Sequence, residues 1–583
     1  MHLKQTTYKK TGRTNLSMVQ SYYDKERRQS CSKTIKNFGF VDILEKTYPD
    51  PIAHFKKVVE EHNDKETKER ADYVVTFKRG ELLAPETSNR KNLGYAPILR
   101  IFYELGLDSF LQNRRIRNSK LEAPSNAIMK LLVISRILDP GSKKRAFENK
   151  GRYFDFEKDA FSLADVYRTL SHFATLEKDM QKLIHERISK QYGRQLELIY
   201  YDVTNYYFEI DKEDDLRKKG VCKSHTSNPI VQLGMAMDSE GIPISYEVFA
   251  GNESEKLHLR PTVLELKEKY IDSKIIAVAD AAQNTGNNIY YLDKGKQGYV
   301  FSQSIRGGAK AFKEYVIAEK GYIWQGEDYK RKSRICRREI QVDFKRSDGS
   351  TYKKKILVDQ RQIVFYSTKY AVRAKAKREA AILKAQKIAN NPSAYTRATS
   401  YGALKYVKNV EVDKQTGEVK PSGGTPLLNY DAIREEEKYD GYYCIVTNLF
   451  DEGKGKYTDE KIIDIYRGLW RIEDSFRVTK SDLETRPIHL TREERIRAHF
   501  LVCFISLVIV RLIQKRIGGG YSAASLIDAM NKISCSHAGE NLFLFDFRNK
   551  TSDELGKAFN LDFTRQVLSR AEIKNILAQC KKV

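Results

Sequence analysis

The stretch LELIYYDVTNYYFEI, from Leu196 to Ile210, sets Asp202 inside a run rich in Ile, Tyr, Val and Phe. Those residue types favour a β-strand, in which an aspartate is uncommon. Two further strand-like runs, PIVQLGMAMD (229–238) and IPISYEVFAG (242–251), flank the turn SEG. Two such runs around a short turn that contains glycine predict an antiparallel hairpin.

The chain then alternates between helix and strand. LRPTVLELKEKYI (259–271) has apolar residues at helical spacing, and SKIIAVADAA (273–282) is a short apolar run that ends at Asp280. A continuous apolar run of this kind is typical of a strand buried in a mixed or parallel sheet. Strand, hairpin, helix and strand together predict an α/β core that contains one antiparallel pair.

Size and charge indicate the organisation and the kind of partner. The chain has 583 residues, more than one compact core normally holds, so several domains are expected. Lys and Arg exceed Asp and Glu by 103 − 77, a formal net charge of +26. That excess favours a polyanionic partner, nucleic acid before membrane, over the alternative of a merely soluble basic protein.

The seven cysteines form no C-x-x-C pair, and their number is odd. Both facts disfavour a zinc site or a disulfide framework and favour a reducing cytoplasm. The N-terminus lacks the apolar segment of a signal peptide. The most apolar run, FLVCFISLVIV (500–510), is too short to span a bilayer and predicts a buried helix.

Changes of pattern along the chain divide it into six expected regions. They are an N-terminal β-hairpin region (1–48), a helical region that is a candidate for DNA binding (49–195), the two halves of the α/β core (196–298 and 441–515), a β-rich insertion with a long basic helix (299–440) and a C-terminal helical tail (516–583). The basic helix is expected at 371–389. For this helix and for the region 49–195, the alternative to phosphate contact is a solvated charged face.

A third acidic residue stands in YRGLWRIEDSFRVTK, from Tyr466 to Lys480. Read as one helix, this stretch places Tyr466, Glu473 and Lys480 nearly in line, with Trp470 and Arg477 on the same side. A separate apolar stripe consists of Ile465, Leu469, Ile472 and Phe476. Taken singly, the two aromatic residues indicate packing and the lysine a surface charge.

Asp202, Asp280 and Glu473 are candidates for a divalent metal site. Mg²⁺ and Mn²⁺ prefer oxygen ligands, and two such ions can activate a nucleophile and stabilise a leaving oxygen in phosphoryl transfer. A lone aspartate at a strand end is more often a turn former or a cap partner than a metal ligand. Glu473 four residues before Arg477 is also an ordinary helix ion pair. Spacing alone leaves both interpretations open.

The chain resembles the DDE-type transposases of bacterial insertion sequences, in the branch whose third acid lies in a Tyr-Arg-Glu-Lys signature. The resemblance rests on four blocks in the family's order: IYYDVTNYYFE around Asp202, GMAMDSEGIPISYEVFAGNESE after it, IIAVADAAQNT around Asp280 and YRGLWRIEDSFRVTKSDLETRPI around Glu473. It implies a ribonuclease H-like mixed-sheet core interrupted by the β-rich insertion, with a mostly helical N-terminal region and a helical C-terminal tail.

By this resemblance, Asp202, Asp280 and Glu473 are the catalytic acids and bind two Mg²⁺ ions, with Mn²⁺ as a substitute. Tyr466 and Lys480 match the signature residues that contact DNA near the cleaved strand. These roles are what the family implies for the matching positions.

One signature position departs from the family, because the arginine expected three residues after Tyr466 is Leu469 here. We hypothesise that Arg477, on the same face of the expected helix, supplies the missing phosphate contact. Trp470 is a candidate to stack on an unpaired base near the cut, with core packing as its alternative role.

The implied activity is that of a Mg²⁺-dependent transposase. A water activated by one metal ion attacks a phosphodiester at the transposon end, and the freed 3′-hydroxyl attacks target DNA. The implied partners are double-stranded DNA and a second copy of the chain, in a synaptic homodimer without a membrane, in the bacterial cytoplasm at the nucleoid. The alternatives are a ribonuclease H-like nuclease without strand transfer and a catalytically inactive DNA-binding derivative.

Overall fold

The computed structural model forms two compact units, Met1–Thr87 and Ser88–Val583. The residues that it describes are 1–9, 11–24, 29–68, 75, 80, 82, 88–117, 123–156, 161–221, 228–270, 273–397, 399–413, 416–450, 455–539 and 541–582. The six described cysteines are all free thiols.

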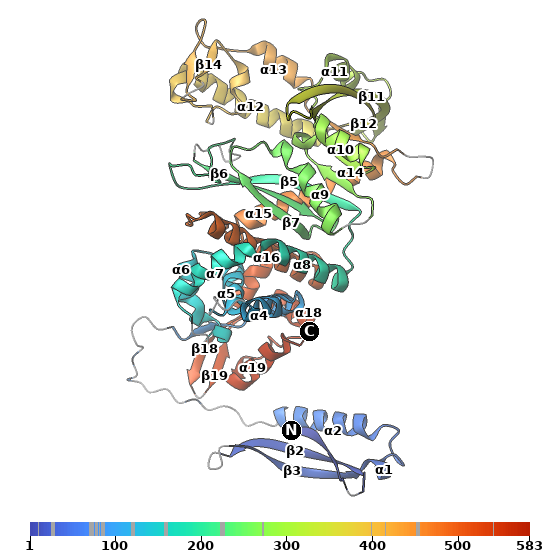
Figure 1. Ribbon diagram of the computed structural model, residues 1–583, viewed down its shortest axis with the longest axis vertical. Coiled ribbons are helices and arrows are strands. Elements are labelled where there is room, and N and C mark those ends of the chain that lie inside the picture. The colour runs from blue at the N-terminus through green and yellow to red at the C-terminus, as the bar shows by residue number, and fades with distance from the viewer. Residues whose placement is uncertain are drawn as a thin grey trace. The chain divides into compact units, whose positions relative to one another are not determined.

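The N-terminal unit is a three-stranded antiparallel sheet with two helices (Figure 1). Its elements are β1 (His2–Thr7), β2 (Thr14–Asp24), β3 (Gln29–Phe40), α1 (Val41–Leu44) and α2 (Pro51–Lys68). β2 and β3 occupy the segment of the expected hairpin. The sequence pattern does not predict β1. Its sequence, HLKQTT, contains a single apolar aliphatic residue, and the strand is almost wholly exposed.

The centre of the second unit is a mixed sheet with the strand order β10-β11-β12-β17-β9-β8-β5-β6-β7. Its core strands are β5 (Leu198–Tyr207), β6 (Ile230–Met237), β7 (Pro243–Ala250), β8 (Ile276–Ala279) and β9 (Gly298–Ser302). The first three pair antiparallel, whereas β8 runs parallel to β5 and β9 parallel to β8. This α/β sheet is consistent with a ribonuclease H-like core, and its five core strands contain a second antiparallel pair, β5 with β6, beyond the one predicted.

The two faces of the sheet are buried in different cores, because side chains alternate along each strand. Tyr200 and Tyr206 of β5 and Val278 of β8 pack into one core, and Tyr201 and Val203 of β5 pack into the other. The second core includes residues of α9 (Leu259–Lys269) and α10 (Gly286–Lys294). The segment that carries Glu473 packs against the first face, because its apolar residues belong to the same core.

Much of the expected insertion extends the central sheet instead of forming a separate domain. The strands of the insertion are β10 (Ile323–Gln325), β11 (Tyr329–Lys345) and β12 (Thr351–Ser367), and the next strand of the sheet, β17 (Tyr442–Thr447), belongs to the expected second half of the core. They pair antiparallel in succession, and β17 joins them to β9. A small core of its own lies around α12 (Thr368–Asn390), which contains the predicted basic helix. The boundary expected at 298/299 passes through β9.

The region before the sheet is helical and packs around α16 (Glu493–Ile517) (Figure 1). Its helices are α3 (Ala96–Glu104), α4 (Leu107–Arg117), α5 (Ser125–Leu138), α6 (Lys143–Glu148), α7 (Leu163–Thr175) and α8 (Glu177–Tyr192). α16 is long and apolar enough to cross a membrane, but 89% of its most apolar window is buried inside the protein. It is the core helix that FLVCFISLVIV predicts.

The C-terminal region corrects one expectation, because it is not only helical. Its elements are α17 (Ala523–Lys532), β18 (Ser534–Gly539), β19 (Leu542–Phe545), α18 (Lys550–Phe559), β20 (Val567–Ser569) and α19 (Arg570–Gln579). The strands form a sheet with β4 (Arg90–Asn92), in the order β20-β19-β18-β4. The sequence pattern does not predict these strands, because they are short and because β4, the strand that pairs with β18, lies far from them in the sequence.

Candidate active site

Two of the predicted acids lie on neighbouring parallel strands, Asp202 in the middle of one and Asp280 directly after the end of the other. Asp202 lies in β5, and Asp280 directly follows β8. The register pairs Tyr200 with Val278, and each aspartate stands two residues further along its strand. Asp280 keeps an extended backbone, with φ −76° and ψ −176°. Because side chains alternate, both carboxylates belong to the face that carries Tyr200 and Val278.

A tight turn at Gly468 divides the expected single helix into α14 (Asp459–Arg467) and α15 (Trp470–Lys480). Amides after the turn bond three residues back, which winds the chain more tightly there. The Tyr200 hydroxyl donates to the Ile465 carbonyl at 3.2 Å, and a Cβ at position 468 would lie 1.9 Å from that hydroxyl. Glycine permits this approach, and the alignment expected of one straight helix is not kept.

α15 runs along β5 past the position of Asp202. Near its C-terminal end, Lys480 donates to the Thr204 hydroxyl at 2.5 Å, and the Thr479 hydroxyl lies 2.9 Å from that of Tyr206. Thr204 and Tyr206 are on the same face of β5 as Asp202. The signature lysine is therefore held next to the first aspartate, half-buried rather than on the open surface.

Tyr466 of α14 links the other two acids. Burial raises the pKa of its hydroxyl to about 12, a hydrogen bond with the Ser302 side chain opposes this, and the charges of Asp280 and Glu473 raise it further. Both carboxylates thus lie within electrostatic reach of one hydroxyl. A phenol with this pKa is a neutral hydrogen-bond donor at neutral pH.

The three acids share one region but are not a formed metal cluster. Within the described ranges, no three His, Cys, Asp or Glu side chains converge closely enough to hold a metal ion. The donor chemistry nevertheless fits Mg²⁺, which prefers carboxylate oxygens. Backbone amides orient two of the carboxylates: Asp202 Oδ1 accepts from Val203 at 2.7 Å and Asp280 Oδ1 from Ala282 at 2.9 Å. Glu473 lies on the exposed side of α15.

Trp470 is not a core residue, because its side chain is 58% exposed. It lines a cavity of about 370 Å³ together with Arg471, Arg511, Lys515 and Tyr521. Aromatic rings among cations suit the stacking of a base beside its phosphate. Trp470 is therefore not buried in the core, and both its predicted contact with DNA and its alternative role in packing stay predictions.

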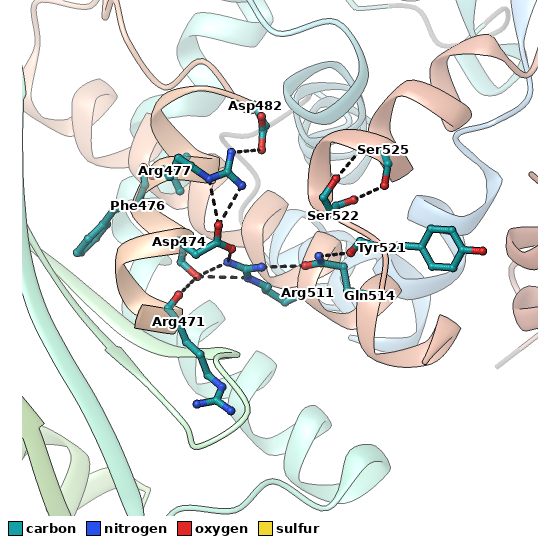
Figure 2. Close-up of polar contacts among 12 residues, drawn as sticks. Arg471, Asp474, Phe476, Arg477, Asp482, Arg511, Gln514, Tyr521, Ser522 and Ser525 are labelled. Atoms are coloured by element: carbon teal, nitrogen blue, oxygen red, sulfur yellow. Dashed lines mark hydrogen bonds and ion pairs between the residues drawn. The ribbon is translucent and has the colours of Figure 1, made fainter. Parts of the chain in front are cut away.

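Arg477 is engaged by carboxylates next to it. Figure 2 shows its guanidinium between Asp474 and Asp482, at 3.0 and 3.3 Å. Asp474 also pairs with Arg511 of α16 at 2.8 Å, so one carboxylate joins two cations and two helices. Burial alone would raise the pKa of Asp474, but the hydrogen bonds from Arg511 and Arg477 outweigh it and lower the pKa. The geometry gives Arg477 a structural role, and its DNA contact stays a hypothesis.

Thr204, Ser302 and Arg471 belong to the site, although the sequence pattern does not single them out as functional. Thr204 follows Asp202 by two residues on one strand face, so the alternation of side chains could have identified it. Ser302 and Arg471 needed the tertiary structure. Burial raises the pKa of the Tyr200 hydroxyl and the nearby Arg471 charge opposes it, which places that guanidinium beside the turn between α14 and α15.

Residues 210–509 match the protein family described as "Transposase DDE domain". Asp280 and Glu473 lie inside the matched range, and Asp202 lies just before it. A comparison with curated proteins finds no match. Among solved structures, the chain is similar to a cryo-EM structure of the piggyBac transposase synaptic complex with hairpin DNA, with a TM-score of 0.36 and 9% identity, over 83% of this chain and 85% of that one.

Proposed function

The chain belongs to the family of transposases that share the DDE domain, and we propose that it is the DNA transposase of an insertion sequence. In this proposal it binds the transposon ends, cleaves a phosphodiester there and transfers the 3′-hydroxyl to target DNA. The observation that supports it most is the level placement of Asp202, in the middle of β5, and Asp280, just after the end of the parallel strand β8, on the face crossed by α15.

We assign metal binding to Asp202, Asp280 and Glu473, which would supply carboxylate oxygens from the middle of one strand, the end of its parallel neighbour and one helix. Two Mg²⁺ ions bound there, or Mn²⁺ in their place, would supply a water of lowered pKa and stabilise the charge on the leaving oxygen. The chain's contribution is the orientation of the carboxylates by the amides of Val203 and Ala282.

Both chemical steps are displacements at phosphorus. In the first, a water oxygen bonds to phosphorus and the bond to the 3′-oxygen breaks, which leaves a 3′-hydroxyl on one side and a 5′-phosphate on the other. In the second, that 3′-hydroxyl attacks a phosphorus of target DNA and displaces the target strand's own 3′-oxygen. Neither step forms a bond between protein and DNA, so no nucleophilic Ser or Tyr is required.

Lys480, Tyr466 and Trp470 hold the DNA in this proposal. Lys480 is bonded to Thr204, two residues from Asp202, so its ammonium can hold a phosphate beside the carboxylates as a point charge. The Tyr466 hydroxyl donates a hydrogen bond to a phosphate oxygen and keeps its proton. Trp470 stacks on an unpaired base at the mouth of its cavity, and Arg471 supplies the cation there, because Arg477 is already paired with carboxylates.

Two other activities are compatible with a DDE domain. A ribonuclease H-like nuclease would cut the DNA but not join it, and a catalytically inactive derivative would only bind it. The presence of all three acids favours an active enzyme over the inactive derivative. The formation of a joined product separates a transposase from a nuclease.

The test is the cleavage of DNA that carries the element's own ends, in Mg²⁺, by the wild type and by Glu473→Gln. We expect end cleavage and joined products from the wild type, and a loss of cleavage of about a thousandfold in the variant with DNA binding kept. Equal cleavage by both proteins, or undiminished cleavage in a chelator, would reject the proposal. Cleavage without joined products would establish the nuclease.

Transposition joins two ends, so we also propose that two copies of the chain meet in a synaptic complex with DNA. The helical region 49–195 and α12 remain candidates for duplex contacts. The excess of positive charge along the chain favours such contacts. A cytoplasmic location at the nucleoid follows from this proposal. Mass measurement of the complex with end DNA would test the pairing of two chains.

A further inference from the structure

Lys143, the first residue of α6, is a buried lysine in the helical block, away from the carboxylates of the candidate active site. Its side chain is 5% exposed, and its ammonium lies 3.0 Å from Nδ1 of His499 on α16. Nε2 of that histidine lies 2.9 Å from the Thr485 carbonyl. A carbonyl can only accept, so Nε2 carries the proton and Nδ1 accepts from Lys143. The imidazole is therefore neutral and offers the ammonium no counter-charge.

No carboxylate of the described chain forms an ion pair with Lys143. Asp139, on the same loop, is used by Arg145 at 2.5 Å and by Asn149 at 2.7 Å. Arg136 adds a second buried positive charge, since its guanidinium donates only to backbone carbonyls. A buried charge without a partner is costly, so a lysine in this position either loses its proton or gains an anion.

A small cavity of about 30 Å³ adjoins this lysine. Its lining includes Arg136, Gly141, Ser142, Lys143, His489 and His499. Ser142 and His489 are exposed, whereas Lys143 and His499 are buried, so the cavity leads from the surface to the ammonium. One water needs about 10–15 Å³ by this measure, so the space suits a halide or one or two oxygens of a phosphate, but not a whole nucleotide.

We propose that this cavity, the Lys143 notch, is an anion-binding site that takes a free inorganic anion or a phosphate group of the DNA backbone. The anion supplies the negative charge that the surrounding side chains lack. Ser142 and His489 can donate to it at the mouth, and the two remaining ammonium protons can do so at the base. The free-anion form of the proposal is independent of transposase activity, and only the DNA form rests on the proposed function.

The titration of the neighbouring groups agrees with this geometry. Burial and then the Arg136 charge lower the pKa of Lys143 to about 7, and burial followed by the Lys143 charge lowers that of His499. Among the described residues, the other titratable groups that face the notch are Cys503 of α16, His489 of the loop and Tyr167 of α7. None of them is a carboxylate, so an anion is the group that would keep Lys143 protonated.

The first test compares the unfolding of the full chain in chloride or phosphate with its unfolding in gluconate, at equal ionic strength and at pH 7. Gluconate is the reference anion because it is far larger than a halide and presents only a singly charged carboxylate. We expect chloride or phosphate at ten times the dissociation constant to shift the unfolding equilibrium of the wild type by about tenfold. Lys143→Met should abolish the shift. The matched control is Lys130→Met, because Lys130 is also buried but pairs with Asp108 and should leave the shift unchanged.

The second test distinguishes the two sources of the anion. If a DNA phosphate enters the notch, Lys143→Met should lower the slope of log binding constant against log salt by about 0.9, and Lys130→Met should not. An unchanged slope, together with anion-dependent stability, assigns the notch to a free inorganic anion. If anions change stability equally in all three proteins and the slope is also unchanged, there is no anion site.

A third measurement needs no variant, in case Lys143→Met does not fold. Wild-type crystals soaked in bromide should show an anomalous peak within hydrogen-bond distance of the Lys143 ammonium. A notch without bromide at a concentration that labels other surface sites would overturn the free-anion form. Activity plays no part in this readout, so its failure would leave the proposed transposase function intact.

Discussion

Asp202 and Asp280 stand level with each other, each two residues beyond the paired positions Tyr200 and Val278 on neighbouring parallel strands. Strand register, rather than distance along the chain, sets this relationship. A slip of one residue in either strand would turn one carboxylate to the opposite face, where the other hydrophobic core lies. Selection for two acids at one site is therefore also selection for this register.

We predict that Asp202→Asn and Asp280→Asn each reduce end cleavage by roughly 10²–10³-fold, because each removes one charged oxygen ligand from a shared site. DNA binding, measured in Ca²⁺ or in chelator, should fall far less. Asp359→Asn is the control, since Asp359 is an exposed aspartate of the same sheet that pairs with Arg337. A large loss in only one of the two aspartate variants would contradict a shared role.

Tyr466→Phe should lower cleavage by about tenfold and leave the pH dependence of cleavage unchanged. The substitution keeps the aromatic ring but removes the hydroxyl on which the charges of Asp280 and Glu473 act. Because burial and these charges raise the hydroxyl pKa to about 12, the group does not titrate in the working range. Cleavage rates of both proteins between pH 6 and 9 would check this. A basic limb that disappears in the variant would show that the hydroxyl acts by losing its proton.

Gly468→Ala should displace α15 and destabilise the protein by about 1–3 kcal/mol, because the new methyl group would overlap the Tyr200 hydroxyl. Thermal unfolding and cleavage should both be impaired. In the double variant with Tyr200→Phe the loss should be smaller than the sum of the two single losses, since the clashing oxygen is absent. Additive losses would mean that the clash is relieved elsewhere.

Arg471→Ala should weaken binding to end DNA and reduce its salt dependence, because Arg471 lies in the cavity beside Trp470. Arg477→Ala should instead act mainly on stability, since that guanidinium is paired with Asp474 and Asp482. Salt titrations of binding and thermal unfolding of both variants separate the two effects. Weakened DNA contact in Arg477→Ala with unchanged stability would restore the role first expected for Arg477.

The stability of the anion-free protein should rise with pH from about 7 towards 10.5, because of Lys143. Its pKa is about 7 in the folded chain, below the ordinary value of 10.5, so the unfolded chain binds the additional proton in that window. The contribution is on the order of a few kcal/mol, and Lys143→Met should remove it. Denaturant unfolding at pH 7 and pH 9 in gluconate measures it. If the stability of the wild type did not rise relative to that of the variant between pH 7 and pH 9, the result would contradict the lowered pKa.

Much of the site was predictable because its signals are local. Asp202 and Asp280 interrupt apolar strands, and Glu473, Tyr466 and Lys480 share one short segment. In the structure, the charges of Asp280 and Glu473 both act on the Tyr466 hydroxyl. Lys480 donates to the hydroxyl of Thr204, which follows Asp202 by two residues on the same face of β5. Their roles in metal binding and DNA contact remain predictions.

The errors arose where a side chain's surroundings come from distant segments. Trp470 on an ideal helix could pack or be exposed, and the tertiary structure leaves its side chain 58% exposed. The pairing of Arg477 with Asp482 depends on the turn after α15. The C-terminal strands depend on β4, and the extension of the sheet depends on the pairing of β12 with β17.

The sequence by itself determined which residues carry charge into apolar strands, where the buried helix lies and which chemistry three carboxylates favour. These properties depend on residue type and on spacing within one element, which are present in the chain before it folds. Only the tertiary structure decided that two aspartates stand level, that a glycine turn bends the signature helix against Tyr200, and that Lys143 is buried with no ion pair to any carboxylate of the described residues. Each of these depends on register or on packing between remote segments, and no local pattern specifies them.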